Sequence, residues 1–328
     1  MTTTVPTGVG ASATDGPSET AAAADSAVPA SAAPAPGSSD GTAGGATPAR
    51  RSRRRKKPRW FSNSLAVLFS AVWIFPVYWM VNTAFKPRSE SMTSTPLFLP
   101  QNPTLDNFVV AITQSGFLVN LRNSAVVVIA TVLLAIILGF FAAAALSRFR
   151  FRGRRTIMIV ILAVQMLPTT ALLIPLFLIF NSIGLLGTYA GLVLAYIATV
   201  LPFSIWVMRG FFVAIPMEIE EAAQLDGANT WQVLTRILFP LVAPGVIATS
   251  IFAFIAAWND YIIAYTFMKD QSMYTLPVWL ASFVSQNTGT DSGGQMAASV
   301  LFSLPVVVFF VIIQRNLVSG MSAGAVKG

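Results

Sequence analysis

Long apolar stretches free of charge alternate with short polar segments from about residue 60 to the C-terminus. A helix needs about 20 such residues to cross a bilayer. Six stretches qualify, although the fifth contains one acid and the sixth is short and contains Pro305: they run over 64–83, 124–146, 157–180, 189–208, 241–267 and 297–313. Unpaired backbone groups are not tolerated in lipid, so we predict an all-α fold, a polytopic membrane bundle of six transmembrane helices.

Several of these stretches contain proline, including Pro76, Pro168, Pro175 and Pro202. Proline is tolerated in transmembrane helices because neighbouring helices can satisfy the carbonyl groups that it frees. We therefore expect each stretch to form one span.

The first 59 residues differ in composition from the rest. Residues 1–49 are mostly Ala, Ser, Thr, Gly and Pro without apolar periodicity, which predicts a disordered tail. The basic run RRSRRRKKPR at 50–59 directly precedes the first apolar stretch. This arm either fixes the membrane topology or attracts anionic lipid. We divide the chain into this tail and arm, 1–59, and a six-span domain, 60–328.

The low charge content supports a membrane location, because 10% of residues are charged against about 25% in soluble domains. With the N-terminus inside, 17 of the 21 Lys and Arg residues fall on the inner side and 4 on the outer side. This bias predicts that both termini are cytoplasmic and that the protein lies in the cytoplasmic membrane. The bases are split among short loops, which disfavours a nucleic-acid partner.

The segment 209–240 holds a cluster of acids between the fourth and fifth stretches. Pro216 suits the start of a helix, and the glutamates that follow it are favoured there by the helix dipole. Gly227 is placed to end that helix with a positive φ. Asn229 followed by Gln232 predicts a capping box and a second helix. We expect a helix, a glycine turn and a helix on the cytoplasmic face.

Within this segment, Glu221-Ala222-Ala223, Gly227, Ile237 and Phe239-Pro240 have the spacing of a known motif. The pattern resembles the EAA loop of ABC importer permeases, with Phe239 where Leu is usual. The resemblance implies a coupling helix that docks into a groove on an ATPase subunit. The implied coupling residues are Glu220, Glu221, Ala222, Ala223, Asp226, Gly227, Ala228, Ile237 and Pro240.

The resemblance covers roughly 60–328. Met166-Leu167-Pro168, Leu201-Pro202-Phe203, Trp258-Asn259-Asp260 and the end of the chain at 320–328 are similar to the sugar-importing, maltose-type inner six-span subunits. The resemblance implies a type I ABC importer permease fold and a carbohydrate substrate, a di- or oligosaccharide. It also implies three partners: a second permease subunit, an ABC ATPase dimer and an extracellular solute-binding lipoprotein.

The chain contains no GxxxxGK[ST] phosphate loop, no Cys and no His. Thiol catalysis is excluded, and the commonest general base and the commonest transition-metal ligand are missing. We therefore expect a transport subunit rather than an enzyme, without a metal or cofactor of its own. ATP and Mg²⁺ would bind the separate ATPase chain.

Asp260 is the one acid within a predicted span, about 28 Å along the helix from its inner end. An intramembrane acid is a candidate functional residue, but an acid near a helix end can also be a cap or a snorkelling side chain. Trp258, Asn259 and Tyr261 are further candidates for a solute path, although Trp and Tyr near span ends are commonly interfacial anchors. The resemblance also suggests that the polar loop 286–295 reaches into the binding protein.

Two alternative functions stay open. One is an ion-coupled secondary transporter, which is disfavoured by the lack of an evident repeat and of intramembrane ionisable groups beyond Asp260. The other is an ABC permease for a polar solute that is not a sugar. A membrane-embedded enzyme is disfavoured by the missing His and Cys and by the absence of clustered acids in the spans.

Overall fold

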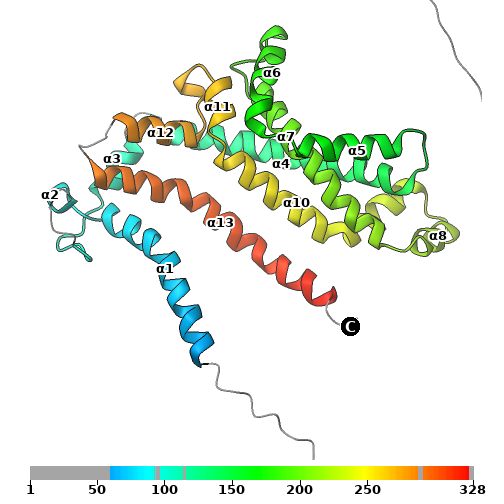
Figure 1. Ribbon diagram of the computed structural model, residues 1–328, viewed down its shortest axis with the longest axis horizontal. Helices are drawn as coiled ribbons and strands as arrows, with labels where there is room; N and C mark the ends of the chain where they lie inside the picture. The colour runs from blue at the N-terminus through cyan, green and yellow to red at the C-terminus, as the bar shows by residue number, and fades with distance from the viewer. Residues whose placement is uncertain (1–59, 92, 94–96, 114–115, 287–290, 325–328) are drawn as a thin grey trace, which may run out of the picture. The chain divides into compact units, whose positions relative to one another are not determined.

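The computed structural model describes residues 60–91, 93, 97–113, 116–286 and 291–324, and these residues form helices and no strands (Figure 1). The predicted tail and basic arm, 1–59, lie outside the described residues. The helices are α1 Trp60–Ala84, α2 Arg88–Ser91, α3 Asp106–Thr113, α4 Phe117–Arg148, α5 Arg154–Gln165, α6 Thr169–Ser182, α7 Tyr189–Ala214, α8 Glu218–Leu225, α9 Thr230–Gln232, η1 Val233–Leu238, α10 Phe239–Asn259, α11 Ile262–Phe267, η2 Gln271–Met273, α12 Leu276–Gln286 and α13 Ser292–Gly324.

Five helical stretches among the described residues are long and apolar enough to cross a membrane. They are Asn63–Ala84, Phe117–Arg148, Tyr189–Ala214, Thr230–Asn259 and Ser292–Gln314. A sixth span results if α5 and α6, which are bent by 106° at a short break, count as one. The prediction of an all-α bundle of membrane helices is therefore confirmed, and the third span is the one that is broken.

The break replaces the continuous span expected over 157–180. Pro168 has an extended backbone, with φ −64° and ψ 134°, and α6 begins at the next residue. A residue before proline is pushed away from helical dihedrals, and proline itself has no amide hydrogen to continue the ladder. Pro76 and Pro202 lie inside continuous helices, as expected.

The fifth span is shifted relative to the stretch expected over 241–267. It begins at Thr230 and ends at Asn259. Asp260 has an extended backbone, with ψ 122°, and α11 follows as a separate short helix. The helical part therefore extends further toward the acidic loop, and ends earlier at its other end, than the hydrophobic pattern indicates.

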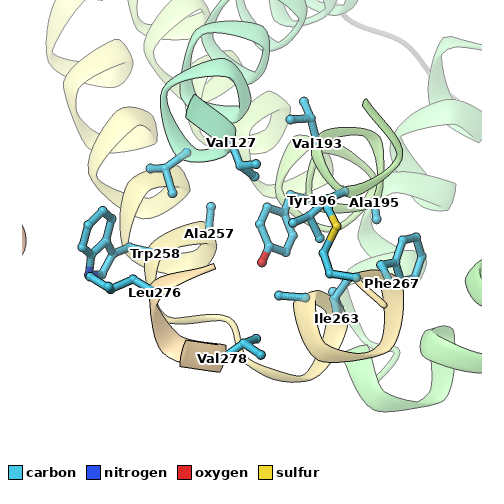
Figure 2. Packing of buried hydrophobic residues seen from close by; sticks show 14 of the residues in the cluster. Val127, Val193, Ala195, Tyr196, Ala257, Trp258, Ile263, Phe267, Leu276 and Val278 are labelled. Atoms are coloured by element: carbon cyan, nitrogen blue, oxygen red, sulfur yellow. The ribbon is translucent and has the colours of Figure 1, made fainter. Parts of the chain in front are cut away.

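The core is formed mainly by α4, α7 and α10, which pack against one another. Val127, Tyr196, Ala257, Ile263 and Phe267 meet in its largest buried cluster, which Figure 2 shows from close by. Small residues allow α4 and α7 to approach closely: a Cβ added at Gly139 would lie 3.3 Å from the Ser204 Cβ. Such contacts are typical of helices that pack in lipid.

The helix α1 packs along α13 and exposes most of its apolar side chains, including Trp73 at 78%. An apolar surface of this extent needs lipid or protein around it. The described part of the chain therefore has the surface of a membrane protein.

Candidate functional site

The helix α8 forms as the sequence predicts. Glu218, Glu220 and Glu221 lie in its first turn, where the helix dipole favours negative charge. Gly227 has φ 88°, and its amide donates to Gln224 O at 3.0 Å. The amide of the following residue, Ala228, reaches back to Ala223 O at 3.0 Å, as expected after a left-handed residue at a helix end. The predicted helix and glycine turn are confirmed.

The capping box after this turn is also present. The Asn229 side-chain oxygen accepts the Gln232 amide at 2.9 Å, and the Gln232 side-chain oxygen accepts the Asn229 amide at 2.9 Å. The helix that starts here, however, is not a separate element on the membrane surface. It runs through α9 and η1 into α10 as one stretch, Thr230–Asn259. The turn at Gly227 is therefore attached directly to a core span.

The π-helix η1 contains the motif's apolar residue, Ile237, and ends two residues before its proline, Pro240. The Phe239 amide donates to Leu234 O, five residues back, instead of four. Pro240 supplies no amide hydrogen, and its ring would crowd the Arg236 carbonyl in a regular α-helix. The wider turn relieves both problems.

An ion pair between α4 and α8 holds the loop on the bundle. The Arg148 guanidinium pairs with the Glu220 carboxylate, and it also donates to Ile215 O at 3.2 Å. The guanidinium carbon lies 5.9 Å from the centre of the Phe212 ring. Burial raises the pKa of Glu220, and the positive charge of Arg148 opposes that rise. Arg148 is one of the 17 bases that the sequence predicts on the inner side, but no local pattern links it to an acid 72 positions later.

The predicted coupling residues divide between two faces of the loop. Glu220 is buried, and Ala223 and Ala228 pack against a cluster that includes Val233 and Leu238. The exposed residues of the set are Glu221, Ala222, Asp226, Gly227 and Pro240. Ile237 is half-buried.

Large apolar side chains accompany the exposed acids of this loop. Leu225 is 89% exposed, and Met217 is 47% exposed. The loop thus presents a mixed acidic and apolar surface on a short helix, while its other face is anchored to the core.

The four candidates for a solute path are not brought together. Trp258 is buried and stacks on Phe254 at 5.6 Å. Asn259 is exposed and donates to Ile255 O at 2.9 Å. Tyr261 is exposed and stacks on Tyr265 at 5.4 Å. Consecutive residues at the end of a helix point in different directions, so the side chains of these candidates are separated from one another.

Asp260 acts as a helix cap. One of its oxygens accepts the amides of Ile263 at 3.0 Å and Ala264 at 3.1 Å, and the Tyr196 hydroxyl at 3.3 Å. The first turn of α11 has free amides that such an oxygen satisfies. The capping interpretation, which the sequence left open beside a functional one, is therefore realised.

Asp260 also lines a cavity of about 270 Å³ beside the break between α5 and α6. Hydroxyl groups of Tyr196, Thr199, Thr169 and Thr170 belong to the same wall. A neighbouring cavity of about 180 Å³ shares Thr169 and Thr199 with it. Hydroxyls and one carboxylate can bond a hydroxylated solute. The sequence analysis missed these four residues, because nothing in their spacing distinguishes them from other polar residues in a span.

The comparisons with known proteins agree with this geometry. Residues 135–323 match the family model of the binding-protein-dependent transport system inner membrane component. The diacetylchitobiose uptake system permease protein DasC of Streptomyces coelicolor is 38% identical, over 82% of this chain and 97% of that protein. The trehalose transport system permease protein SugB of Mycobacterium tuberculosis is 35% identical, over 78% and 93%.

A solved structure shares the fold. It is a crystal structure of a bacterial ABC transporter involved in the import of the acidic polysaccharide alginate, with a TM-score of 0.69 and 24% identity, over 79% of this chain and 97% of that chain. The family match covers more than half of the chain, and the relatives match over nearly their whole length. The protein therefore belongs to the binding-protein-dependent transport system inner membrane components and is a multi-pass permease subunit of an ABC importer.

Proposed function

We propose that this permease moves a carbohydrate, a di- or oligosaccharide, into the cell and draws its energy from a separate ATPase dimer. The observation that carries the proposal is α8, a helix with an acidic and apolar face left exposed while its other face is fixed to the bundle. The names of three relatives supply the substrate class: they are permeases for diacetylchitobiose, trehalose and galactooligosaccharides.

Two physical connections would carry ATPase movement into the membrane. The turn at Gly227 leads without interruption through η1 into α10, and the Arg148–Glu220 pair joins α8 to α4. Both α4 and α10 are core helices. A groove on the ATPase that grips the exposed face of α8 would therefore displace two spans together.

The remaining partners are assigned to particular surfaces. The exposed apolar side chains of α1 offer area for the second permease subunit. The distribution of Lys and Arg places α8 and both termini on the inner side of the membrane in this proposal. The face opposite α8 is then available to the extracellular solute-binding lipoprotein. The cavity beside Asp260 and Thr199 is the proposed solute contact. The loop 286–295 is proposed to reach into the binding protein, although 287–290 lie outside the described residues.

The coupling loop is tested by ATP-driven uptake in proteoliposomes that contain the full importer. Glu221→Lys reverses an exposed charge on α8, and Gly227→Pro destroys the positive-φ turn. We expect each to lower uptake of diacetylchitobiose or trehalose at least about tenfold and to reduce co-purification of the ATPase. Arg152→Glu, an exposed charge reversal outside α8 and away from the proposed solute contacts, is the matched control and should leave uptake unchanged.

The same vesicles separate the alternative functions. Uptake that persists in wild-type vesicles without ATP and follows an imposed proton or sodium gradient would identify a secondary transporter. Uptake of another polar solute but of no sugar would retain the ABC permease and reject the carbohydrate. Deletion of 286–295 should abolish transport while the subunits still assemble, and preserved uptake would reject the role of that loop.

A further inference from the structure

A second cavity lies at the end of α4 that is remote from α8. It has a volume of about 260 Å³ and is bounded by the start of α4, the η2 segment and α12. Asn120 in its wall precedes Arg148, the residue that holds α8, by 28 positions, or about 42 Å of helix. The cavity and α8 therefore belong to opposite faces of the membrane. We call this cavity the outer pocket.

The residues that line the outer pocket are neutral. They combine carboxamides and hydroxyls, including Asn120, Ser272 and Gln286, with the aromatic side chains of Trp279 and Phe283. A charged solute would find no opposite charge among the residues of this wall, and burying an unpaired charge is costly. A sugar ring fits the wall, because its apolar faces can contact aromatic rings while its hydroxyls bond amides and hydroxyls.

Asn120 adds an unmet hydrogen-bonding requirement. Its side chain is 3% exposed, and its oxygen is buried without a hydrogen-bond partner in the described part of the chain. A buried acceptor left in this condition is unfavourable, and a ligand hydroxyl would relieve it. Rotation of the carboxamide exchanges its oxygen and nitrogen, so that the group can offer an acceptor or a donor to the cavity.

The backbone keeps space for that carboxamide. Gly116 has φ 101°, and a Cβ added there would lie 2.9 Å from the Asn120 nitrogen. Glycine therefore serves both the left-handed conformation and the close approach of the amide. On the opposite wall, Ser282 is a small residue of α12, and its hydroxyl is bonded to Val278 O within its own helix.

We propose that the outer pocket is a subsite for one neutral sugar ring at the outer mouth of the permease. Sites for drug-sized ligands span about 300–1,000 Å³, so a cavity of about 260 Å³ suits a single ring rather than a whole oligosaccharide. The inference rests on the proposed carbohydrate function and adds to it a second contact for the solute, separate from the cavity beside Asp260. The pocket would select neutral sugars over sugar acids.

Binding is measured by saturation-transfer NMR on the full chain in lipid nanodiscs, with glucose, N,N′-diacetylchitobiose and glucuronate as probes. We expect transfer to the neutral sugars and at least about threefold less to glucuronate. Ser282→Phe fills the pocket without removing a lining amide and should lower the transfer to glucose at least about fivefold. Asn120→Leu should lower it about as much. Asn181→Leu, the same change at an exposed position outside the pocket, is the control.

Three results would overturn the proposal: no transfer to any neutral sugar, equal transfer to glucose and glucuronate, or undiminished transfer in Ser282→Phe. In the third case, a weaker binding of the sugar-free binding protein to Ser282→Phe would show that the pocket is a docking site for a partner side chain. Size-exclusion profiles verify that each variant is folded, and Ser282→Phe tests the pocket even if Asn120→Leu does not fold.

Uptake by the full importer separates this inference from the function on which it rests. If the pocket binds the sugar, Ser282→Phe raises KM for uptake at least about fivefold. Wild-type uptake of sugar with an unaltered KM in Ser282→Phe would reject the pocket alone. A wild-type importer that takes up no sugar would reject the carbohydrate function itself.

Discussion

The two ends of α4 are held by different kinds of interaction. The N-terminal end of α4 is the one that the proposed orientation places outside, and we call it the outer end. There the Asn123 amide donates to Ser272 O at 2.8 Å and Tyr274 O at 3.0 Å, and its oxygen accepts the Tyr189 hydroxyl at 2.8 Å. At the other end, the main polar tether to α8 is the Arg148–Glu220 pair. The carbonyls that this buried amide bonds are fixed by the backbone, whereas an ion pair can exchange its partner for another charge.

This difference corresponds to what each end has to do. The outer end fixes the loop between α11 and α12 against the bundle, and the Ser124 hydroxyl also accepts the Leu276 amide at 2.6 Å. The other end keeps α8 in position while one face of it stays exposed. A neutral, fully paired network favours one fixed arrangement, and a single ionic tether favours a helix that moves with a partner.

The largest effect is expected from Asn123→Leu. The substitution leaves the carbonyls of Ser272 and Tyr274 without their donor and the Tyr189 hydroxyl without its acceptor, in a position that is fully buried. We expect a loss of about 4 kcal/mol of unfolding free energy. Thermal unfolding in detergent, followed by size-exclusion fluorescence, measures it. Asn181→Leu serves as the control, and an unchanged midpoint would show that this network does not fix the outer end.

Arg148→Ala should have the next largest effect. It leaves Glu220 buried without its cation, and the two side chains are only 10% and 11% exposed. We expect a loss of about 3 kcal/mol of unfolding free energy, measured by the same thermal unfolding experiment. Removal of both charges in Arg148→Met with Glu220→Leu should recover more than half of the loss, because no unpaired charge remains. Arg236→Ala, at an exposed position in η1, should be nearly neutral. Equal losses for both arginines would contradict the ionic tether.

Gly227→Ala is expected to cost about 1 kcal/mol, through the positive φ of 88° alone, because nothing lies within 4 Å of an added Cβ. Gly210→Ala is the matched control: its surroundings are equally open, but it lies within α7 and does not have a positive φ. Alanine there should be neutral or stabilising. The difference between the thermal unfolding midpoints of the two variants measures the contribution of the positive φ at Gly227. Identical midpoints would contradict the role of the glycine turn.

The smallest effect is a pH dependence at the α8 end. Burial raises the pKa of Glu220 above its ordinary value of 4.5, so the native state binds its proton more tightly than the unfolded state. This contribution to stability is therefore present below the unfolded pKa and is lost as the pH rises through the raised value. Glu220→Gln should remove that slope, which lies above the ordinary pKa of 4.5. A wild-type profile whose slope has the opposite sign would mean that Arg148 outweighs burial.

The sequence predicted the local structure of the coupling loop well because its signals are local. Pro216, the glutamates of the first turn, Gly227 and the Asn229–Gln232 pair each act within a few residues. The spans were also predictable, since hydrophobic length alone determines them. The six-span fold follows once the broken third span is counted.

What the sequence did not predict depends on contacts between distant segments. Arg148 pairs with Glu220, and Asn123 with Ser272, which lies 149 residues later. The sequence also could not show that Pro168 breaks its span while Pro202 does not, because both are prolines in apolar stretches. The burial of Trp258 was likewise not predictable, because burial of a Trp near a span end depends on its neighbours, here Phe254.

The π-helix η1 has a consequence for the length of the coupling loop. A π-turn holds about one residue more than an α-turn, so loss of a single residue between 233 and 238 would restore a regular helix. The segments on either side would keep about the same relative rotation, because the wide turn already absorbs the extra residue. One residue inserted or deleted in α9 would instead turn α8 by about 100° around the axis of α10. The π-helix thus marks a place where the length of this segment can change without changing which side chains α8 presents outward.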